Sequence, residues 1–349
     1  MLRQQDVGHR IVVRRIVGIR EGRPLFSDAL GELVELSETH LTLATAQGQL
    51  RVPVAQVHRA KRVPPTRRPT AAAVVALERA ADEAWPAPTR DQLGDWLLRA
   101  ADGWTGRANS ALPIGDPDRP LPAAVDAVER WYADRGQTPI INTPLPLAAP
   151  VGAELDARGW AARPPVLVQT TPLPLRPPAT SSPPGNAPVA RRTPATAGQH
   201  SDQPGTAVAD ADRWSSAVVE LAAAPSAEWL AVAAGRKGSL PDAARHVLTA
   251  VGQVRFAHVY DDSTLVAVGR GTVTGQGRWL GLSLIEVSPV ARRQGLASRV
   301  IHELAAWGVS TGATHAFLQV EQHNTAAVAL YRRLGFTTHH TYLTRVAPH

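Results

Sequence analysis

Residues 282–308 read LSLIEVSPVARRQGLASRVIHELAAWG, and this stretch decides the fold. Its first six residues, Leu282–Val287, are mostly apolar, and Ser288-Pro289 stops the run. From Leu296 onward, apolar residues return at the spacing of one helix face. The segment therefore predicts a buried strand, a turn that contains Gly295, and an amphipathic helix.

The turn before this helix has the properties of an anion site. The first N–H groups of a helix have no partner within the helix, and the aligned peptide dipoles place partial positive charge there. Gly295 has no Cβ to hold a phosphate away from the backbone, and two neighbouring guanidinium groups add full charge. We therefore expect a diphosphate to bind here. The residues expected to hold it are Arg292, Arg293, Gln294, Gly295, Leu296, Ala297 and Ser298.

A second motif occupies residues 318–336, which read LQVEQHNTAAVALYRRLGF. An apolar strand leads through Asn324 into a short helix. Gly335 is suited to end that helix, because glycine adopts the left-handed backbone conformation of a helix C-terminus without strain. Phe336 then provides an apolar anchor for the next segment.

Together the two motifs resemble the GNAT superfamily of N-acetyltransferases. The core signature of that superfamily is Arg or Gln, two residues, Gly, one residue, then Gly or Ala. Arg292, Gly295 and Ala297 fill it, and the resemblance covers residues 275–346. It implies an α+β fold with a mixed sheet and acetyl-CoA as co-substrate.

The resemblance also implies roles for three further residues. In the GNAT fold the two central strands separate, and the pantetheine arm of the coenzyme pairs with strand amides such as that of Val287. Asn324 is then expected to hydrogen-bond the pantetheine, and a plain helix cap is the alternative. Tyr331 stands where the family has the general acid that protonates the departing thiolate, and packing against the sheet is its alternative role.

The general base is left open by the sequence. Glu286 on the expected central strand is the preferred catalytic candidate, although a Glu that faces solvent is an equal interpretation. Glu321 is a second carboxylate, Gln319 cannot act as a base, and water is a third option. His339 and His340 are adjacent, and neighbours on a strand point to opposite faces, so no metal site is expected.

Composition bounds the remaining functions. The 349 residues include no Cys, which excludes disulfides, thiolate metal sites and a Cys nucleophile. No run approaches the ~20 apolar residues that span a bilayer, and the start MLRQQDVGHR lacks an apolar export signal, so a cytoplasmic protein is expected. The formal charge of +7 rests on arginines spread along the chain, which favours a solvated basic surface over nucleic-acid binding.

Residues 1–65 are expected to form a small β-barrel. Apolar and polar residues alternate on either side of the turn Gln47-Gly48, as in a half-buried hairpin. The segment resembles the Tudor or Src-homology type of barrel found before some actinobacterial acetyltransferases. Packing or regulation is the favoured role, with a protein partner as a further option. The expected strands are Arg10–Ile19, Leu33–Leu36, His40–Thr45 and Gln49–Val54.

Residues 70–175 are expected to form a degenerate GNAT-like domain. The distance of 23 residues from Gly136 to Gly159 equals that from Gly312 to Gly335, and an aromatic residue follows the second glycine in both cases. In this register the positions of Gly295, Asn324 and Tyr331 are held by Arg119, Ala148 and Leu155. A non-catalytic repeat that completes the substrate cleft is expected, and a chance match is the alternative. Its expected elements are a helix at 71–84, strands at 95–100, 107–112 and 166–171, and a helix that ends at Gly136.

Residues 176–210 are rich in Pro, Ser, Thr and Ala and have no aromatic residue, which predicts a disordered linker. Residues 211–349 are expected to form the catalytic domain. Its expected helices are 225–234 and 241–251, and its expected strands are 254–260, 265–274, 279–287 and 317–320.

The sequence therefore predicts an enzyme that transfers the acetyl group of acetyl-CoA to a primary amine by direct attack. A protein N-terminus, a lysine, an aminoglycoside and a small amine all fit as acceptors. The alternative is a catalytically weak protein that senses CoA and binds a partner through the barrel.

Overall fold

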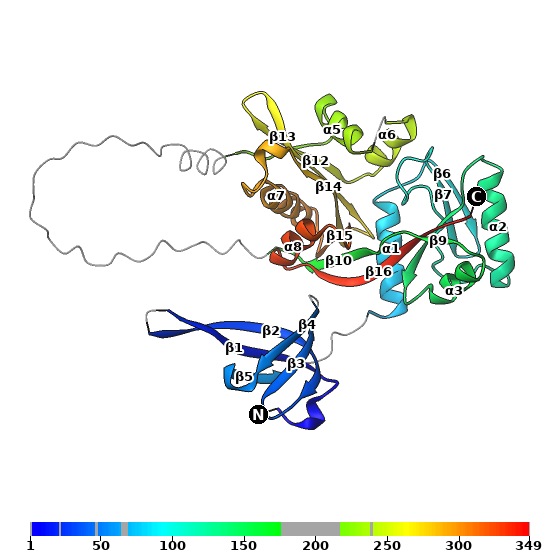
Figure 1. Cartoon of the computed structure of the whole chain (residues 1–349). Coiled ribbons are helices and arrows are strands. Elements are labelled where there is room, and N and C mark those ends of the chain that lie inside the picture. Colours follow the sequence, from blue (N-terminus) through cyan, green and yellow to red (C-terminus); the bar gives the residue numbers. More distant parts are fainter. Residues whose placement is uncertain are drawn as a thin grey trace, which may run out of the picture. The chain divides into compact units, whose positions relative to one another are not determined.

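The computed structural model describes residues 2–20, 22–45, 48–63, 69–175, 217–237 and 240–348 (Figure 1). The chain divides into two compact units, residues 1–68 and residues 69–349. The linker expected over residues 176–210 lies outside the described residues.

The first unit is a five-stranded antiparallel sheet in the order β4-β3-β2-β1-β5. Its core is made of aliphatic side chains, among them Ile11, Val13 and Leu43, which are fully buried. The expected strand at residues 10–19 is confirmed, whereas the strand expected at residues 33–36 is the end of a much longer one. The strands are β1 (Arg10–Arg20), β2 (Arg23–Leu36), β3 (His40–Thr45), β4 (Gly48–Pro53) and β5 (Val57–Arg62).

The second unit is built on one mixed sheet in the order β11-β12-β13-β14-β15-β10-β16-β8, with β9 beside β16. Among the strand ladders of the residues that the structure describes, the one between β14 and β15 is parallel and the others in this unit are antiparallel. β6 and β7 form a separate hairpin. The strands are β6 (Thr89–Leu93), β7 (Trp96–Ala100), β8 (Ile140–Leu145), β9 (Ala161–Ala162), β10 (Val166–Pro172), β11 (Glu220–Ala222), β12 (Val254–Asp261), β13 (Thr264–Thr274), β14 (Trp279–Val287), β15 (His315–Glu321) and β16 (Thr337–Val346).

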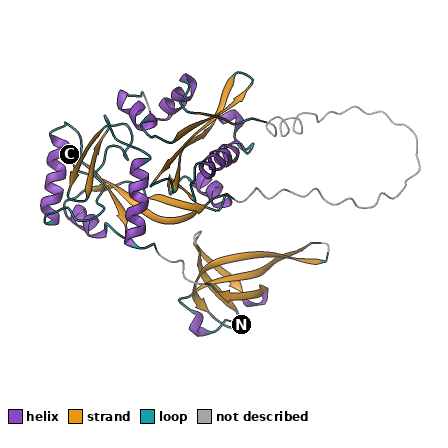
Figure 2. Cartoon of the chain, turned by 180° about the vertical axis from the view of Figure 1, so that it is seen from behind, coloured by secondary structure: helices purple, strands orange, loops and turns teal. Residues whose placement is uncertain are grey.

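Helices cover both faces of this sheet (Figure 2). On one face, called here the α7 face, α7 buries Leu296, Val300 and Leu304 against strand residues such as Leu280 and Leu318. On the other face, called here the α1 face, α1 packs Leu77 against Val168 and Phe317, while α5 and α6 cover Phe256 and Val268. The helices are α1 (Ala71–Glu83), α2 (Leu121–Ala133), α3 (Ala149–Ala157), α5 (Ala227–Lys237), α6 (Asp242–Thr249), α7 (Leu296–Ser310) and α8 (Thr325–Arg333).

A strand from the middle segment is inserted into the C-terminal sheet. β10 pairs antiparallel with β15 on one side and with β16 on the other. β16 in turn pairs with β8, so the sheet continues through both segments. Residues 70–175 and 211–349 therefore share one sheet and one compact unit.

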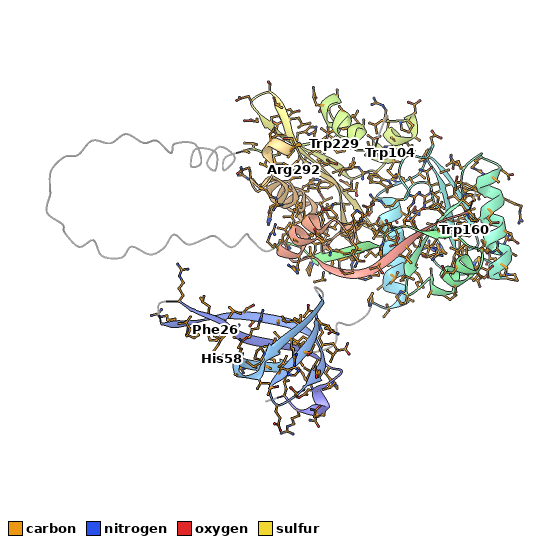
Figure 3. The ribbon with its side chains drawn as sticks, viewed as in Figure 1. Phe26, His58, Trp104, Trp160, Trp229 and Arg292 are labelled. Atoms are coloured by element: carbon orange, nitrogen blue, oxygen red, sulfur yellow. The ribbon has the colours of Figure 1, made fainter. Side chains whose placement is uncertain are left out.

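The repeat inferred from the glycine spacing has a counterpart in the order of elements. The run α2-β8-α3 corresponds to α7-β15-α8, and all four glycines have positive φ just after a helix. After α3 the N–H of Trp160 donates to Leu155 O at 2.9 Å, and after α8 the N–H of Phe336 donates to Tyr331 O at 3.0 Å. The aromatic rings of Trp160 and Phe336 are both buried, and Trp160 is labelled in Figure 3.

The prediction of a strand over residues 107–112 is wrong. The chain there is a turn, in which the side-chain amide of Asn109 accepts from Ala101 N at 2.7 Å and donates to Thr105 O at 2.8 Å. Only Ala111 and Leu112 form isolated bridges. The Asn109 side chain thus holds its own segment against the preceding loop, residues 101–105, in a turn, because Asn hydrogen-bonds readily to nearby N–H and C=O groups.

Candidate active site

The parallel strands β14 and β15 separate part of the way along their length. Their pairing starts at Trp279 with His315 and ends at Leu282 with Leu318. β14 nevertheless continues to Val287 and β15 to Glu321. Past the last pair, the facing backbone groups of the two strands have no ladder between them. Backbone amides of this kind need a ligand or water as partner.

A bulge in β14 decides which residues face each side of the gap. Leu284 has φ of +53°, and three steps along β14 match two steps along β13 between Ser283 and Glu286. The extra residue shifts the alternation, so Ile285 and Val287 pack on the α7 face. Glu286 pairs with Val268, whose side chain is buried on the α1 face, and directly opposite residues share a face.

The predicted glycine turn precedes α7. Gly295 is the N-cap of α7 with φ of +81°, and Arg293 also has positive φ, at +67°. A Cβ on Gly295 would meet no atom within 4 Å, so the space in front of the helix start is open. The helix carries no side-chain cap. The open N–H groups and the missing cap leave room for an anion at this point.

The side chains around Gly295 differ in their exposure to solvent. Arg292 and Arg293 are exposed, and Arg292 Nε donates to Val287 O at 3.2 Å, which ties the turn to the end of β14 (Figure 3). Leu296 is 1 % exposed and belongs to the core, so only its N–H group is available to a ligand. The remaining members, Gln294, Ala297 and Ser298, are half-buried.

The second motif has the local structure that its sequence predicts. Asn324 is the N-cap of α8, and its Oδ1 accepts from Ala327 N at 3.2 Å. Tyr331 is half-buried on α8 and packs against the same apolar cluster as Val287, with its ring 5.9 Å from that of Phe336. The cap role of Asn324 is thus observed, and its amide N–H₂ group remains for a second role.

Replacing Asn324 by Ala is expected to lower the free energy of unfolding of the second unit by about 1 kcal/mol, because the N-cap hydrogen bond is lost. Asn324→Asp is the matched control, since Asp caps a helix as well as Asn does but has no amide donor. Urea unfolding followed by circular dichroism measures both. Equal loss of stability in the two variants would contradict the cap assignment.

The two candidate carboxylates have different surroundings. Glu286 is half-buried on the α1 face of β14, beyond the point where the strands separate. Glu321 is exposed at the end of β15 and lies 3.1 Å from His323 Nε2, also exposed. Of the two, Glu286 is the one that the bulge places on a covered face of the sheet.

The histidine pair differs from its expected geometry. Between Val168 and Gln169 of β10 the register with β16 shifts, and His339 is the extra residue. This bulge brings the Nδ1 atoms of His339 and His340 to 2.9 Å, so the opposite-face argument does not hold here. His340 is buried and its Nε2 lies 2.6 Å from Glu78 Oε1. In the described part of the chain no group of three His, Asp or Glu side chains is placed to hold a metal ion.

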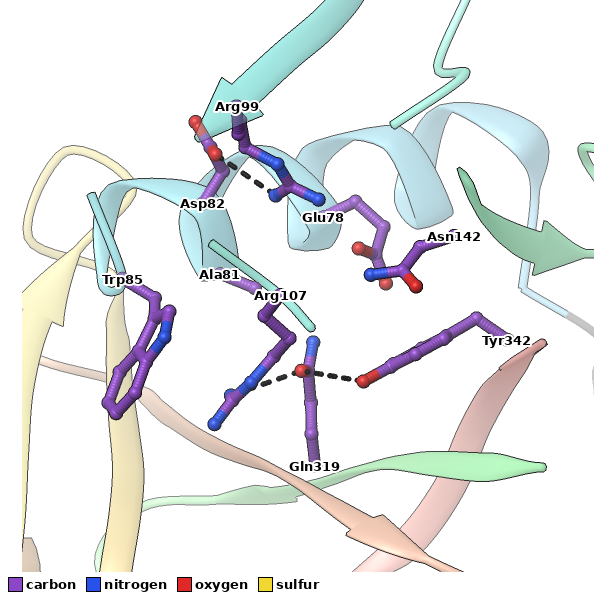
Figure 4. A pocket seen from close by; sticks show the side chains of 9 residues that line it. All are labelled: Glu78, Ala81, Asp82, Trp85, Arg99, Arg107, Asn142, Gln319 and Tyr342. Carbon is purple, nitrogen blue, oxygen red and sulfur yellow. Dashed lines mark hydrogen bonds and ion pairs between the residues drawn. The ribbon is translucent and has the colours of Figure 1, made fainter. Parts of the chain in front are cut away.

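A pocket on the α1 face was missed by the sequence analysis (Figure 4). It is lined from α1 by Glu78 and Asp82, from the middle segment by Arg107, and from β15 and β16 by Gln319 and Tyr342. The lining residues furthest apart in the sequence, Glu78 and Tyr342, are separated by 264 positions. The one local signal is an unusual density of Trp and Arg between residues 85 and 107.

The site fits coenzyme A. Its diphosphate matches the open N-terminus of α7 with two adjacent guanidinium groups, and its pantetheine amides match the backbone groups of β14 and β15 beyond their last ladder pair. No helix in the described ranges is long and apolar enough to cross a membrane.

Comparison with known proteins gives consistent results. Residues 71–173 and 190–344 match the family model described as "Probable histone acetyltransferase Rv0428c C-terminal". The probable histone acetyltransferase Rv0428c of Mycobacterium tuberculosis is 30% identical over 97% of this chain and 95% of its own length. The uncharacterized N-acetyltransferase YobR of Bacillus subtilis is 40% identical over 24% of this chain and 32% of its own length.

A solved GCN5-related N-acetyltransferase from Kribbella flavida has a similar fold, with a TM-score of 0.53 at 15% identity. The likeness covers 79% of this chain and 96% of that one. It concerns the fold alone.

Proposed function

The chain belongs to the GNAT N-acetyltransferases, in the family of the Rv0428c C-terminal region, and from this premise we propose that it transfers the acetyl group of acetyl-CoA to a primary amine. The enzyme is an acyltransferase. We place the reaction in the cytoplasm. A small molecule and a protein both remain as acceptors, and the name of the mycobacterial relative points to a basic protein as one of them.

The separation of β14 and β15 beside the open start of α7 carries this proposal. The N–H groups at Gly295 to Ser298, with Arg292 and Arg293, bind the diphosphate. Strand amides such as that of Val287 and the amide of Asn324 bind the pantetheine. The thioester then lies near the last paired positions, Leu282 and Leu318, because the gap narrows there.

The transfer is a single displacement. The acceptor ammonium gives a proton to the carboxylate of Glu286, and the free amine attacks the thioester carbonyl from the α1 face. The C–N bond forms, the C–S bond breaks, and the Tyr331 hydroxyl gives its proton to the thiolate. The attacking nitrogen loses its second proton to the Tyr331 phenolate, which restores the hydroxyl. The products are the N-acetylated amine and coenzyme A with a free thiol.

Two measurements test the proposed function. Titration calorimetry with acetyl-CoA tests binding, and thiol release with and without a panel of amines tests transfer. The chain has no Cys, so a thiol reagent reacts only with the thiol of the released coenzyme. Amine-dependent thiol release is expected. Tight binding of acetyl-CoA without turnover on any amine would favour a CoA-sensing protein, and no binding at all would refute the site.

A further inference from the structure

The pocket on the α1 face lies where the acceptor must approach. Gln319 is the first residue of β15 beyond the last pair with β14, and it faces this pocket. The side chain of Val168, paired with Gln319, is buried on the α1 face, as is that of Glu286's partner Val268. The pocket therefore opens beside the point where the proposed thioester carbon lies, on the same side as the proposed base.

Arg107 presents a guanidinium group to this pocket (Figure 4). Its Nη1 donates to Gln319 Oε1 at 3.1 Å, and Gln319 Oε1 also accepts from the Tyr342 hydroxyl at 3.4 Å. The guanidinium carbon lies 4.6 Å from the centroid of Trp85, which forms a flat support under it. A guanidinium group has five N–H donors, and Gln319 occupies one of them.

No carboxylate balances this charge at short range. Within the described ranges, no Asp or Glu oxygen lies within 4.0 Å of the Arg107 nitrogens. The two acidic side chains of the pocket have other partners: Asp82 is 3.1 Å from Arg99 and also contacts Arg90, and Glu78 bonds to His340.

Arg270 is a second cation close to Arg107. Arg270 is 1 % exposed, lies 5.2 Å from the same Trp85 ring, and donates to the backbone oxygens of Val247, Leu248 and Ala84. Burial, and next the charge of Arg107, lower the pKa of Arg270 to about 9. Burial also lowers the pKa of Arg107, although Tyr342 and Glu78 favour its charged form. A bound anion would offset both effects.

We propose that the acceptor carries a carboxylate close to its amino group, as an amino acid does, and that Arg107 binds this carboxylate while the amine faces the thioester. The inference rests on the proposed acetyl transfer. Arg is suited to the task because its planar fork donates two parallel hydrogen bonds to a carboxylate. Arg107 contacts Gln319, and Gln319 is the first residue of β15 beyond the last pair with β14, so the proposal places the carboxylate and the amine on the two sides of this one residue.

The test compares acceptors in matched pairs, each a free amino acid and its carboxamide, with the full-length protein. We expect kcat/KM to be at least about 30-fold higher for the acid than for the amide, because a hydrogen-bonded ion pair is lost in the amide. Arg107→Gln is expected to lower kcat/KM about 30- to 100-fold for the acid and to leave the amide nearly unchanged. Arg107→Lys keeps the positive charge but lacks the planar pair of donors, so its kcat/KM for the acid should lie between those of the wild type and of Arg107→Gln.

The control is Arg119→Gln, which removes an exposed guanidinium group from the same segment. Its kcat/KM should equal that of the wild type for both the acid and the amide. Equal loss on acid and amide in Arg107→Gln, or a wild-type preference for the amide or for a lysine-rich peptide, would overturn the proposal. The comparison of acid and amide needs only the wild-type protein, so it stands even where a variant fails to fold. Loss of acetyl-CoA binding in calorimetry would instead refute the proposed function itself.

Discussion

Replacing Tyr331 by Phe is expected to lower kcat about 10²- to 10⁴-fold, the range over which a positioned general acid contributes. The KM for acetyl-CoA should stay the same, because only the hydroxyl group is removed. The ring contact with Phe336 at 5.9 Å and the packing on the α7-face core are kept, so the fold should be retained. Steady-state thiol release at saturating acetyl-CoA measures the effect.

Tyr260→Phe is the matched control for this experiment. Tyr260 lies on β12, where its ring stacks on that of His258 at 6.2 Å, away from α8. Its kcat should equal that of the wild type. A Tyr331→Phe variant with less than a fivefold loss would leave Tyr331 as a packing residue, and the thiolate would then leave without an enzymic acid.

Gly295→Leu is expected to weaken acetyl-CoA binding at least about 100-fold, which corresponds to about 2.7 kcal/mol. The space in front of Gly295 is open, and a side chain placed there would occupy the volume proposed for the diphosphate. The substitution also strains the backbone, because φ is +81° and an L-residue in this region loses roughly 1–2 kcal/mol. Titration calorimetry measures the affinity directly.

Gly159→Leu separates the two effects. Gly159 has φ of +73° after α3, and a Cβ there would also meet no atom within 4 Å. The two variants should lose similar stability, while only Gly295→Leu should lose affinity for the coenzyme. Equal affinity in both variants would mean that the diphosphate binds elsewhere.

The parts of the fold that local sequence determines could be predicted. The strand, turn and helix over residues 282–308 are confirmed, because proline, glycine and apolar spacing each act within a few residues. The mixed α+β fold of the acetyltransferases is confirmed as well. The cap at Asn324 and the positive φ of Gly335 follow from the same local rules.

The parts that depend on distant contacts could not be predicted. The residues around Leu284 give no sign of its φ of +53°. The bulge at this position nevertheless determines on which face of the sheet Glu286 and Val287 lie. The bulge at His339 likewise overrode the alternation expected of a strand. Arg107 contacts Gln319 across 212 residues, and its own segment was wrongly predicted to be a strand. The periodicity of apolar residues reflects local structure only. The two bulges and the contact of Arg107 depend on residues that are far away in the sequence.

The insertion of β10 between β15 and β16 has a consequence for biosynthesis. On the ribosome, β10 emerges long before its two neighbours, because residues 173–314 separate it from β15. Until then the nascent chain carries an apolar strand with two open edges, which is a hazard for aggregation. A chain truncated before His315 would lack both partners of β10, so translation of β15 and β16 determines whether the earlier strands are incorporated into a complete sheet.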